Sequence, residues 1–387
     1  MGPAGYCGRD DTRAWYTEVN LSVGIVGLPE VGKTALFNGL THRSTSAGGR
    51  STTATVPVPD ERLDTLARMV KPKRVVPTGV QFVDVAGLVK GGAREGGLGG
   101  QFLGQLQGVN ALAIVLRCFE RPDIGFGPEP AQPLDDLETI LIELQLSDLS
   151  RIDKRLERTE KSARARDPQA QREEQTLLEL RSALDAGRAA RSAEVPETDI
   201  AALKDLALST LKPMIFVANV SEQDLAILHD PAAEDPRGVR GMLMQIEEAA
   251  RVNDAEVAVV CAQLEAELAE LDEADAREYL ESLGVTETGL SRFITAAYRE
   301  LGLLTFFPAG EPEVRAWTVR QGARAPEAAG VIHSDIERGF IRAEVTPYER
   351  LVEAGSPARA KELGYTRLEG KDYVMQEGDV VYFRFSV

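Results

Sequence analysis

Residues 27–34 read Gly27-Leu-Pro-Glu-Val-Gly-Lys-Thr34, and this stretch decides the fold of the chain. It fits the pattern G-x-x-x-x-G-K-[ST] of a phosphate-binding loop. An apolar run that begins at Leu21 precedes it, and residues 34–40 follow with apolar side chains at helical intervals. When a loop of this kind joins a strand to a helix, its backbone N–H groups and the helix N-terminus can surround a phosphate chain. The sequence therefore predicts a nucleotide-binding α/β domain.

Three further apolar runs extend this domain, at residues 80–84, 111–118 and 213–219. Each run is short and nearly continuous, which is typical of a strand buried on both faces. Strands of this kind alternate with helical segments. We therefore expect a P-loop NTPase domain with a mostly parallel sheet and helices on both faces.

The texture of the chain changes twice. Between the third and fourth strands, apolar residues recur at steps of three and four with a polar break near residue 167, which predicts an antiparallel helical hairpin. After about residue 301, short alternating runs separated by Gly and Pro predict a separate β-rich domain. The expected parts are an N-terminal extension (1–20), a nucleotide domain (21–134 and 205–300), a helical insertion (135–204) and a C-terminal domain (301–387).

The loop assigns chemical roles to particular residues. Lys33 is expected to reach the β- and γ-phosphates, and the Thr34 hydroxyl to bind Mg²⁺. Asp84 ends the second strand and can approach the metal through water, while the Gly87 N–H can meet the γ-phosphate. The nucleotide-binding residues expected in the loop itself are Gly27, Glu30, Val31, Gly32, Lys33, Thr34 and Ala35.

Residue 88 bears on turnover. Ras-like enzymes place a water-orienting Gln after the glycine of this motif, and the chain has Leu88 there. Leucine cannot orient water, so we expect slow hydrolysis or a catalytic group from elsewhere. The glycine-rich run at residues 90–100 has the composition of a moving switch loop.

The fourth strand ends in Asn219-Val-Ser-Glu222, where a guanine site has N-K-x-D. The carboxylate of Glu222 is one methylene longer than that of Asp, and Val220 replaces the Lys that packs on the base. Guanine loses its two-pronged partner in this arrangement, which favours ATP over GTP.

The set GLPEVGKT, DVAGLVKGG, NVSE and EVRAWTVRQGARAPEAAGVIHSDIERGFIRAEV resembles the YchF/Obg-like ATPase family over residues 21–387. The resemblance implies a GTPase-type domain, a coiled-coil insertion and a C-terminal TGS domain of β-grasp shape. It also implies a preference for ATP, association with ribosomes or ribosomal RNA, and a backbone contribution to the base pocket near Cys261 and Ala262.

The chain departs from the family pattern at three places. Glu30 stands where members usually have an Asn, whose amide resembles a potassium ligand of related switch GTPases. Residues 46–55 replace the usual first switch segment, so Thr53 or Thr52 is expected to supply the metal-contacting hydroxyl. Ile114 occupies the position of a His that is considered catalytic in many bacterial members, which leaves the catalytic group unknown.

Composition sets the outer bounds. The 387 residues carry a formal net charge of −17, which repels polyanions from most of the surface, so contact with RNA must be local. The local candidate is a basic segment whose simpler interpretation is a solvated helix face: Arg151, Lys154, Arg155, Arg158, Lys161, Arg164 and Arg166. Cys7, Cys118 and Cys261 are expected to be free thiols, and Cys118 a buried structural one. Without an apolar run long enough for a membrane span or a signal peptide, we expect a cytoplasmic protein, and a monomer.

These observations support an ATP-binding switch with slow hydrolysis that engages ribosomes or another part of the translation machinery. Two alternatives stay open at this point. One is a nucleotide-gated binding protein with negligible turnover, and the other is a GTP-specific GTPase.

Overall fold

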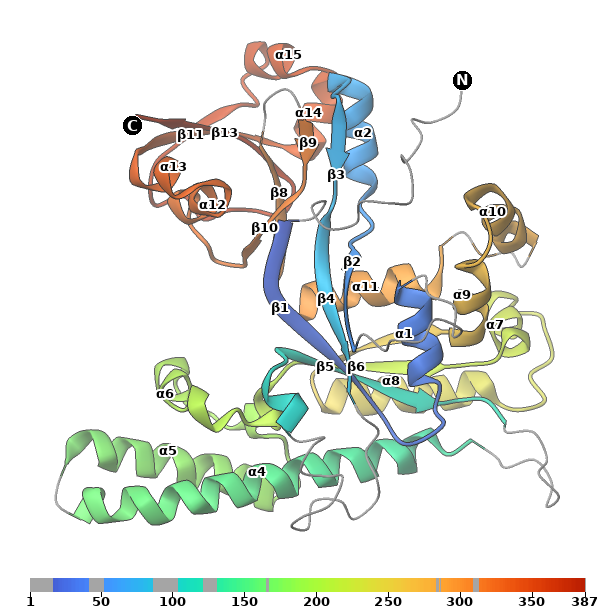
Figure 1. Ribbon diagram of the computed structural model, residues 1–387, viewed down its shortest axis with the longest axis vertical. Helices are drawn as coiled ribbons and strands as arrows, with labels where there is room; N and C mark the ends of the chain where they lie inside the picture. The colour runs from blue at the N-terminus through green and yellow to red at the C-terminus, as the bar shows by residue number, and fades with distance from the viewer. Residues whose placement is uncertain are drawn as a thin grey trace. The chain divides into compact units, whose positions relative to one another are not determined.

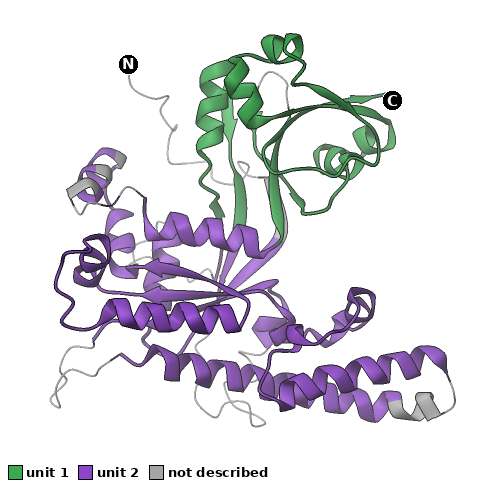
Figure 2. Ribbon diagram, turned by 180° about the vertical axis from the view of Figure 1, so that it is seen from behind, with its two compact units in different colours: residues 1–20, 55–80, 302–387 green, residues 21–54, 81–301 purple. Residues whose placement is uncertain are grey.

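The computed structural model describes residues 17–41, 52–85, 104–120, 131–164, 167–282, 285, 287–308 and 313–386. The chain forms two compact units (Figure 2). One unit holds residues 21–54 and 81–301, and the other holds residues 1–20, 55–80 and 302–387. Within the described residues, no helix has both the length and the apolar character needed to cross a membrane.

A six-stranded sheet follows the phosphate-binding loop, with the strand order β2-β4-β1-β5-β6-β7. β1 pairs in parallel with β5, β5 with β6, and β6 with β7. At the edge, the Asp84 N–H donates to the Thr52 carbonyl and the Val58 N–H to the Thr78 carbonyl, so β2 runs antiparallel to β4. The strands are β1 (Thr17–Val26), β2 (Thr53–Pro57), β4 (Thr78–Asp84), β5 (Ala111–Arg117), β6 (Met214–Asn219) and β7 (Ala255–Val260).

Helices cover both faces of this sheet, and α11 and α8 lie on opposite sides of it (Figure 1). All residues of β5 and β6 are buried, which explains why both read as continuous apolar runs. α11 turns one apolar side inward, and its Phe293 ring lies 5.3 Å from that of Phe82 in β4. The helices are α1 (Lys33–Thr41), α7 (Glu222–His229), α8 (Val239–Val252), α9 (Ala262–Leu268), α10 (Glu273–Ser282) and α11 (Gly289–Glu300). The predicted P-loop domain with a mostly parallel sheet is confirmed.

The insertion is a long helical hairpin, the arm (Figure 1), formed by α4 (Pro133–Arg164) and α5 (Pro168–Asp185). α5 begins where predicted, because Asp167 caps the Gln169 N–H and Pro168 occupies the first turn. The short helices η1 (Ala190–Ser192), α6 (Glu197–Ala202), η2 (Lys204–Leu206) and η3 (Ser209–Leu211) complete it. They share one apolar core with the hairpin: Ile152, Leu177, Leu180, Leu184, Ala190, Leu203 and Leu208.

The second unit contains a five-stranded sheet with the order β10-β8-β13-β11-β12. β8 and β13 are the first and last strands of this sheet along the chain, and they lie side by side and parallel. The other pairings are antiparallel. This arrangement, with a helix after the first hairpin, is the β-grasp that the resemblance implies. Its elements are β8 (Leu303–Pro308), β10 (Trp317–Arg320), α12 (Ala325–Ile332), α13 (Ser334–Arg338), β11 (Phe340–Pro347), α14 (Tyr348–Ala354), α15 (Pro357–Glu362), β12 (Arg367–Glu369) and β13 (Asp379–Phe385).

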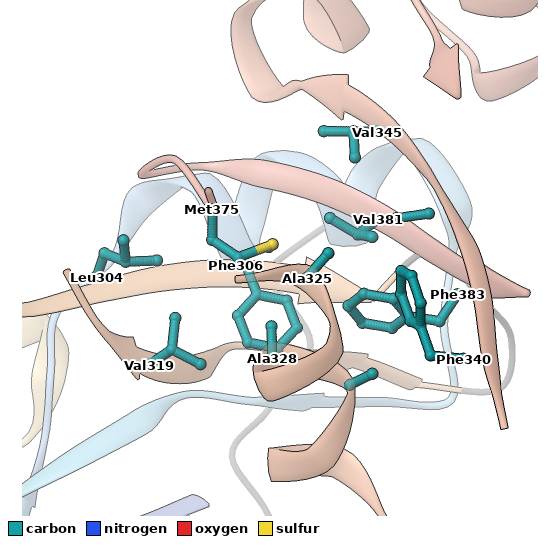
Figure 3. Packing of buried hydrophobic residues seen from close by; sticks show 12 residues of the cluster. Leu304, Phe306, Val319, Ala325, Ala328, Phe340, Val345, Met375, Val381 and Phe383 are labelled. Atoms are coloured by element: carbon teal, nitrogen blue, oxygen red, sulfur yellow. The ribbon is translucent and has the colours of Figure 1, made fainter. Parts of the chain in front are cut away.

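Small residues bring α12 close to this sheet. Ala325, Ala328 and Ala329 are fully buried on the helix, and Figure 3 shows Ala328 beside the ring of Phe306. The Phe383 ring packs between the rings of Phe306 and Phe340, with centroid distances of 6.1 Å to each. The core of the β-grasp therefore packs the alanines of α12 against aromatic and aliphatic side chains of the sheet.

Residues 55–80 pack with this C-terminal unit, although the sequence analysis placed them in the nucleotide domain. They include α2 (Glu61–Val70) and β3 (Arg74–Val76), and β3 pairs in parallel with β9 (Glu313–Arg315). Leu63 and Leu66 of α2 share a second core with residues such as Phe307, Val314 and Leu351. No local pattern distinguishes these residues from the rest of a nucleotide domain, because their partners lie far along the chain. The domain limits given above stay a prediction, and the break between Leu301 and Gly302 falls at the predicted start of the C-terminal domain.

Candidate functional site

The phosphate-binding loop connects β1 to α1, and two of its glycines are required by close packing. A Cβ atom at Gly27 would lie 2.7 Å from the Val115 carbonyl oxygen of the neighbouring strand. Gly32 has φ +96°, and a Cβ atom there would lie 2.2 Å from Nδ2 of Asn219. The loop can therefore lie against β5 and β6 only with glycine at these positions.

Glu30 is the loop residue with an unusual backbone. Its φ is 61°, in the left-handed region that disfavours residues with a Cβ atom. Its side chain is exposed. Asn tolerates this conformation better than Glu does, so the departure at residue 30 changes the backbone energy as well as the charge beside the phosphate site.

Lys33 lies in the first turn of α1 and folds back over the loop. Its Nζ atom donates to the carbonyl oxygens of Gly27, at 3.0 Å, and Leu28, at 2.6 Å. Burial lowers the pKa of Lys33, and the nearby carboxylate of Asp84 partly offsets that effect. The ammonium group is thus held by the loop that is predicted to wrap the phosphates.

The predicted metal-binding residues come from three elements. The Thr34 side chain is exposed at the start of α1, and Asp84 is the last residue of β4. The Asp84 N–H donates to the Thr52 carbonyl at 2.8 Å, and Thr53 begins β2. β2 therefore brings the two candidate threonines of the first switch segment next to Asp84.

Asn219 joins the segment that is predicted to contact the base, residues 219–222, to the phosphate loop. Its Nδ2 atom donates to the Val31 carbonyl at 2.9 Å, and its Oδ1 atom accepts from the Ala262 N–H at 3.0 Å. Asn219 is itself buried, so the two bonds leave its amide with a fixed orientation. One side chain thus holds the loops after β1, β6 and β7 together, at the end of the sheet where α1, α7 and α9 lie (Figure 1).

The other base-reading residues differ in exposure. Val220 is buried, and its N–H donates to the Val260 carbonyl at 2.9 Å. Glu222 is exposed in the first turn of α7, after the Ser221 cap. Cys261 is buried at the N-terminal cap of α9, and Ala262 follows it with its N–H engaged by Asn219.

The structure adds one residue that the sequence analysis missed. The hydroxyl of Tyr279, in α10, donates to Oε1 of Glu222 at 2.7 Å. These residues are 57 positions apart, and no motif links them. Only the folded chain reveals the pair.

Two residues that the sequence analysis singled out have completely buried side chains. Ile114 is completely buried in β5, where the family pattern has a His. Cys118 is also completely buried, and burial raises the pKa of its thiol to about 12, as fits a structural cysteine. Cys118 and Cys261 are both free thiols. The predictions for Gly87, Leu88, residues 90–100, residues 46–51 and Cys7 fall outside the described residues.

Comparisons with known proteins agree with this geometry. A family model described as a 50S ribosome-binding GTPase matches residues 22–161. The C-terminal YchF GTPase model, described as a protein of unknown function (DUF933), matches residues 303–386.

Similar proteins match along nearly the whole chain. The protein named "Ribosome-binding ATPase YchF" of Bacillus subtilis is 45% identical over 95% of this chain and 100% of its own length. The Haemophilus influenzae protein of the same name is 44% identical over 94% of this chain and 99% of its own. A solved structure described as the Schizosaccharomyces pombe YchF GTPase superposes with a TM-score of 0.80 at 29% identity, covering 96% of this chain and 99% of that one.

The names of these relatives divide between ATPase and GTPase, but the sequence identity, the phosphate loop and the β-grasp all point to one family. The chain belongs to the YchF family.

Proposed function

We propose that the chain binds ATP with Mg²⁺ at residues 27–34, Asp84 and residues 219–222, and hydrolyses it slowly as a switch that associates with ribosomes. The observation that carries this proposal is the position of Asn219. It bonds to the phosphate loop through the Val31 carbonyl and to the base-pocket segment through the Ala262 N–H. A nucleotide that bridges these segments contacts a site whose parts are already held together.

The preference for ATP rests on the residues after β6. Val220 is an apolar, buried residue at the position where N-K-x-D has its Lys. The Glu222 carboxylate is the polar group left to contact the base edge, and it accepts hydrogen bonds only. The 6-amino group of adenine donates to such a group, and guanine presents an acceptor at the same position.

The donor set near the phosphates fits Mg²⁺, because it consists of a hydroxyl on Thr34, a carboxylate on Asp84 and hydroxyls on Thr52 or Thr53. Among the described residues, no group of three or more His, Cys, Asp or Glu side chains is placed to hold a metal. Mg²⁺ is therefore expected to bind with the triphosphate, whose oxygens complete its ligands. When bound, the ion would neutralise charge on the β- and γ-phosphates, while Lys33 holds the same oxygens from the loop.

Slow hydrolysis is supported by the residue at position 114 of β5. The side chain of Ile114 is apolar and buried, so β5 provides no proton acceptor or donor at that position. This observation also favours the second candidate, a nucleotide-gated binding protein with negligible turnover. Membership of the family supports a nucleotide hydrolase in general.

Association with ribosomes is proposed from the relatives, which are named ribosome-binding ATPases. It implies a cytoplasmic protein. We keep the expectation that the protein is a monomer.

Calorimetry with ATP and with GTP, each with Mg²⁺, tests the choice of nucleotide. ATP is expected to bind about tenfold more tightly than GTP, or better. The reason is that a polar group of guanine left without a partner at the base site costs on the order of 1–3 kcal/mol of binding free energy. Equal or tighter GTP binding would refute the ATP assignment. The variant Lys33→Ala is expected to lose high-affinity binding of both nucleotides and to keep its circular dichroism spectrum.

Single-turnover release of phosphate separates the two candidate functions. With ATP bound at saturation, measurable release that disappears in Lys33→Ala supports the hydrolase. Release no faster than that of free ATP supports the binding protein without turnover.

A further inference from the structure

The contact between Tyr279 and Glu222 places a phenol beside the residue that is proposed to contact the base. The Tyr279 hydroxyl donates to Oε1 of Glu222 at 2.7 Å. Glu222 begins α7 and Tyr279 lies in α10, so the contact depends on how these two helices fold within the same unit. Both side chains are exposed, and a ligand can reach them.

The hydrogen bond to Glu222 and the negative charge of Glu222 raise the pKa of the Tyr279 phenol, with smaller effects from burial, Glu267 and Cys261. Cys261 directly precedes Ala262, whose N–H is bonded to Asn219. At neutral pH the phenol keeps its proton and remains a hydrogen-bond donor.

The orientation of the Glu222 carboxylate matters because guanine and adenine present different hydrogen-bond donors. Guanine offers N1–H and N2–H₂ together, and its usual partner is a carboxylate that accepts with both oxygens in one plane. Adenine offers one exocyclic amino group, which needs one oxygen. The bond to Tyr279 occupies a lone pair of Oε1 and restrains the rotation of the carboxylate.

We propose that Tyr279 is a specificity-determining positioning residue, which holds the Glu222 carboxylate so that one oxygen serves the base and guanine is disfavoured. This inference rests on the proposed function in one respect, that the base lies against Glu222. It goes beyond the N-x-x-E pattern, because it assigns part of the selectivity to a side chain from a different helix.

The test is calorimetry of GTP and ATP binding, with Mg²⁺, to the wild type and to Tyr279→Phe, which removes the hydroxyl and keeps the ring. Tyr279→Phe is expected to tighten GTP binding and to lower the preference for ATP over GTP by about five- to tenfold, the effect of one hydrogen bond. A preference within twofold of the wild type overturns the inference. So does equal weakening of both nucleotides, which would indicate a merely structural role.

The chain offers a matched control in the other unit. The Tyr365 hydroxyl donates to Oε1 of Glu353 at 2.8 Å, and here Glu353 is exposed and Tyr365 is partly buried. Tyr365→Phe is expected to change neither dissociation constant by more than twofold. If it shifts the preference as much as Tyr279→Phe does, the effect does not arise at the base site, and the inference is refuted.

A double-mutant cycle shows whether Tyr279 acts through Glu222. In a Glu222→Gln background, Tyr279→Phe is expected to change GTP affinity by less than twofold, because the carboxylate that it positions is gone. An effect that persists at full size overturns the inference. The proposed function is judged separately by the wild type: preference for GTP there refutes ATP as the ligand, while tighter GTP binding by Tyr279→Phe still supports the positioning role.

Discussion

At the scale of the residue, Glu30 is the position where the phosphate loop holds the chain in a conformation that its own side chain disfavours. A left-handed backbone costs a residue with a Cβ atom about 1 kcal/mol or more relative to its usual conformations. Asn, the residue usual in the family, pays less of this cost. The exposed carboxylate also lies in the loop that is proposed to bind a triphosphate.

Two substitutions at Glu30 separate these effects. Glu30→Asn is expected to raise the free energy of unfolding by about 0.5–1 kcal/mol and to tighten ATP binding, whereas Glu30→Gln is expected to tighten ATP binding alone. Denaturant unfolding and calorimetry measure the two quantities. The backbone explanation fails if Glu30→Asn is no more stable than Glu30→Gln.

The site residues divide by how local their constraints are. Gly27, Gly32 and Lys33 were predictable because the loop, the strand before it and the helix after it are contiguous in sequence. Asn219 was predictable as a residue at the end of a strand, but its two bonds to Val31 and Ala262 were not. Tyr279 was not predictable at all, because its role depends on a contact between two helices that no spacing rule connects.

At the scale of the element, a buried carboxylate joins two helices behind the nucleotide site. Glu265 of α9 accepts from the Leu290 N–H in the first turn of α11, at 3.0 Å. Burial raises the pKa of Glu265 to about 7 from its ordinary value of 4.5. The proton stabilises the folded state, so this contribution is complete below pH 4.5 and is lost as the pH rises through about 7.

Glu265→Gln keeps an oxygen that can accept from Leu290 and removes the titration. Relative to the wild type, this variant is expected to gain on the order of 3 kcal/mol in free energy of unfolding between pH 5 and pH 8, since one pKa unit corresponds to about 1.4 kcal/mol. Denaturant unfolding at the two pH values measures the gain. Burial also raises the pKa of Glu300 to about 7, but Glu300 is present in both proteins and its effect cancels.

The exposed Glu267 of the same helix provides the matched control. Glu267→Gln is expected to follow the pH dependence of the wild type. A difference between wild type and Glu265→Gln that does not vary with pH would show that Glu265 does not titrate in this range.

Elements were predicted best where the whole signal lay inside the element. The runs at residues 80–84, 111–118 and 213–219 became β4, β5 and β6 with ends shifted by one or two residues. β2 and β7 were not predicted, because β2 is short and half-exposed and β7 alternates only partly. The pairing of β3 with β9 was also beyond reach, since it joins segments far apart in sequence.

At the scale of the whole molecule, the net negative charge restricts which surfaces can bind a ribosome. The structure reduces the basic segment on the arm to fewer side chains that are available for such a contact. Arg151 donates to the carbonyls of Leu206 and Ala207, and Arg155 bonds to Glu173 and Asp205. These two guanidinium groups stabilise the arm itself. Lys154 and Arg158 are exposed on α4, and the side chains of Lys161, Arg164 and Arg166 fall outside the described residues.

Lys154→Glu with Arg158→Glu is therefore the variant that tests the arm without breaking its internal bonds. If the arm contacts ribosomal RNA, cosedimentation with ribosomes is expected to weaken at about 0.1 M salt, and the log–log salt slope of the affinity to fall by about 2. Circular dichroism and ATP affinity serve as checks on folding and on the distant site.

The control variant is Arg251→Glu with Arg299→Glu, which makes the same change in net charge on α8 and α11. Both arginines are exposed. Equal weakening in the two variants would indicate a general effect of charge, and unchanged cosedimentation of the arm variant would show that this face of α4 is merely solvated.

The C-terminal unit combines residues 55–80 with residues 302–387, and this has a consequence for synthesis. The side chains of Thr78 and Thr318 meet across 240 residues of sequence, and Leu63 and Leu66 share a core with Phe307 and Leu351. At roughly 5–20 residues per second, a translating ribosome adds the second segment tens of seconds after the first. During that interval α2 has been made while the partners of its apolar side have not, so it must wait exposed or be shielded by a chaperone. A nascent chain released early, near residue 301, would carry this unpaired surface with it, and its aggregation would report on how long the first segment waits.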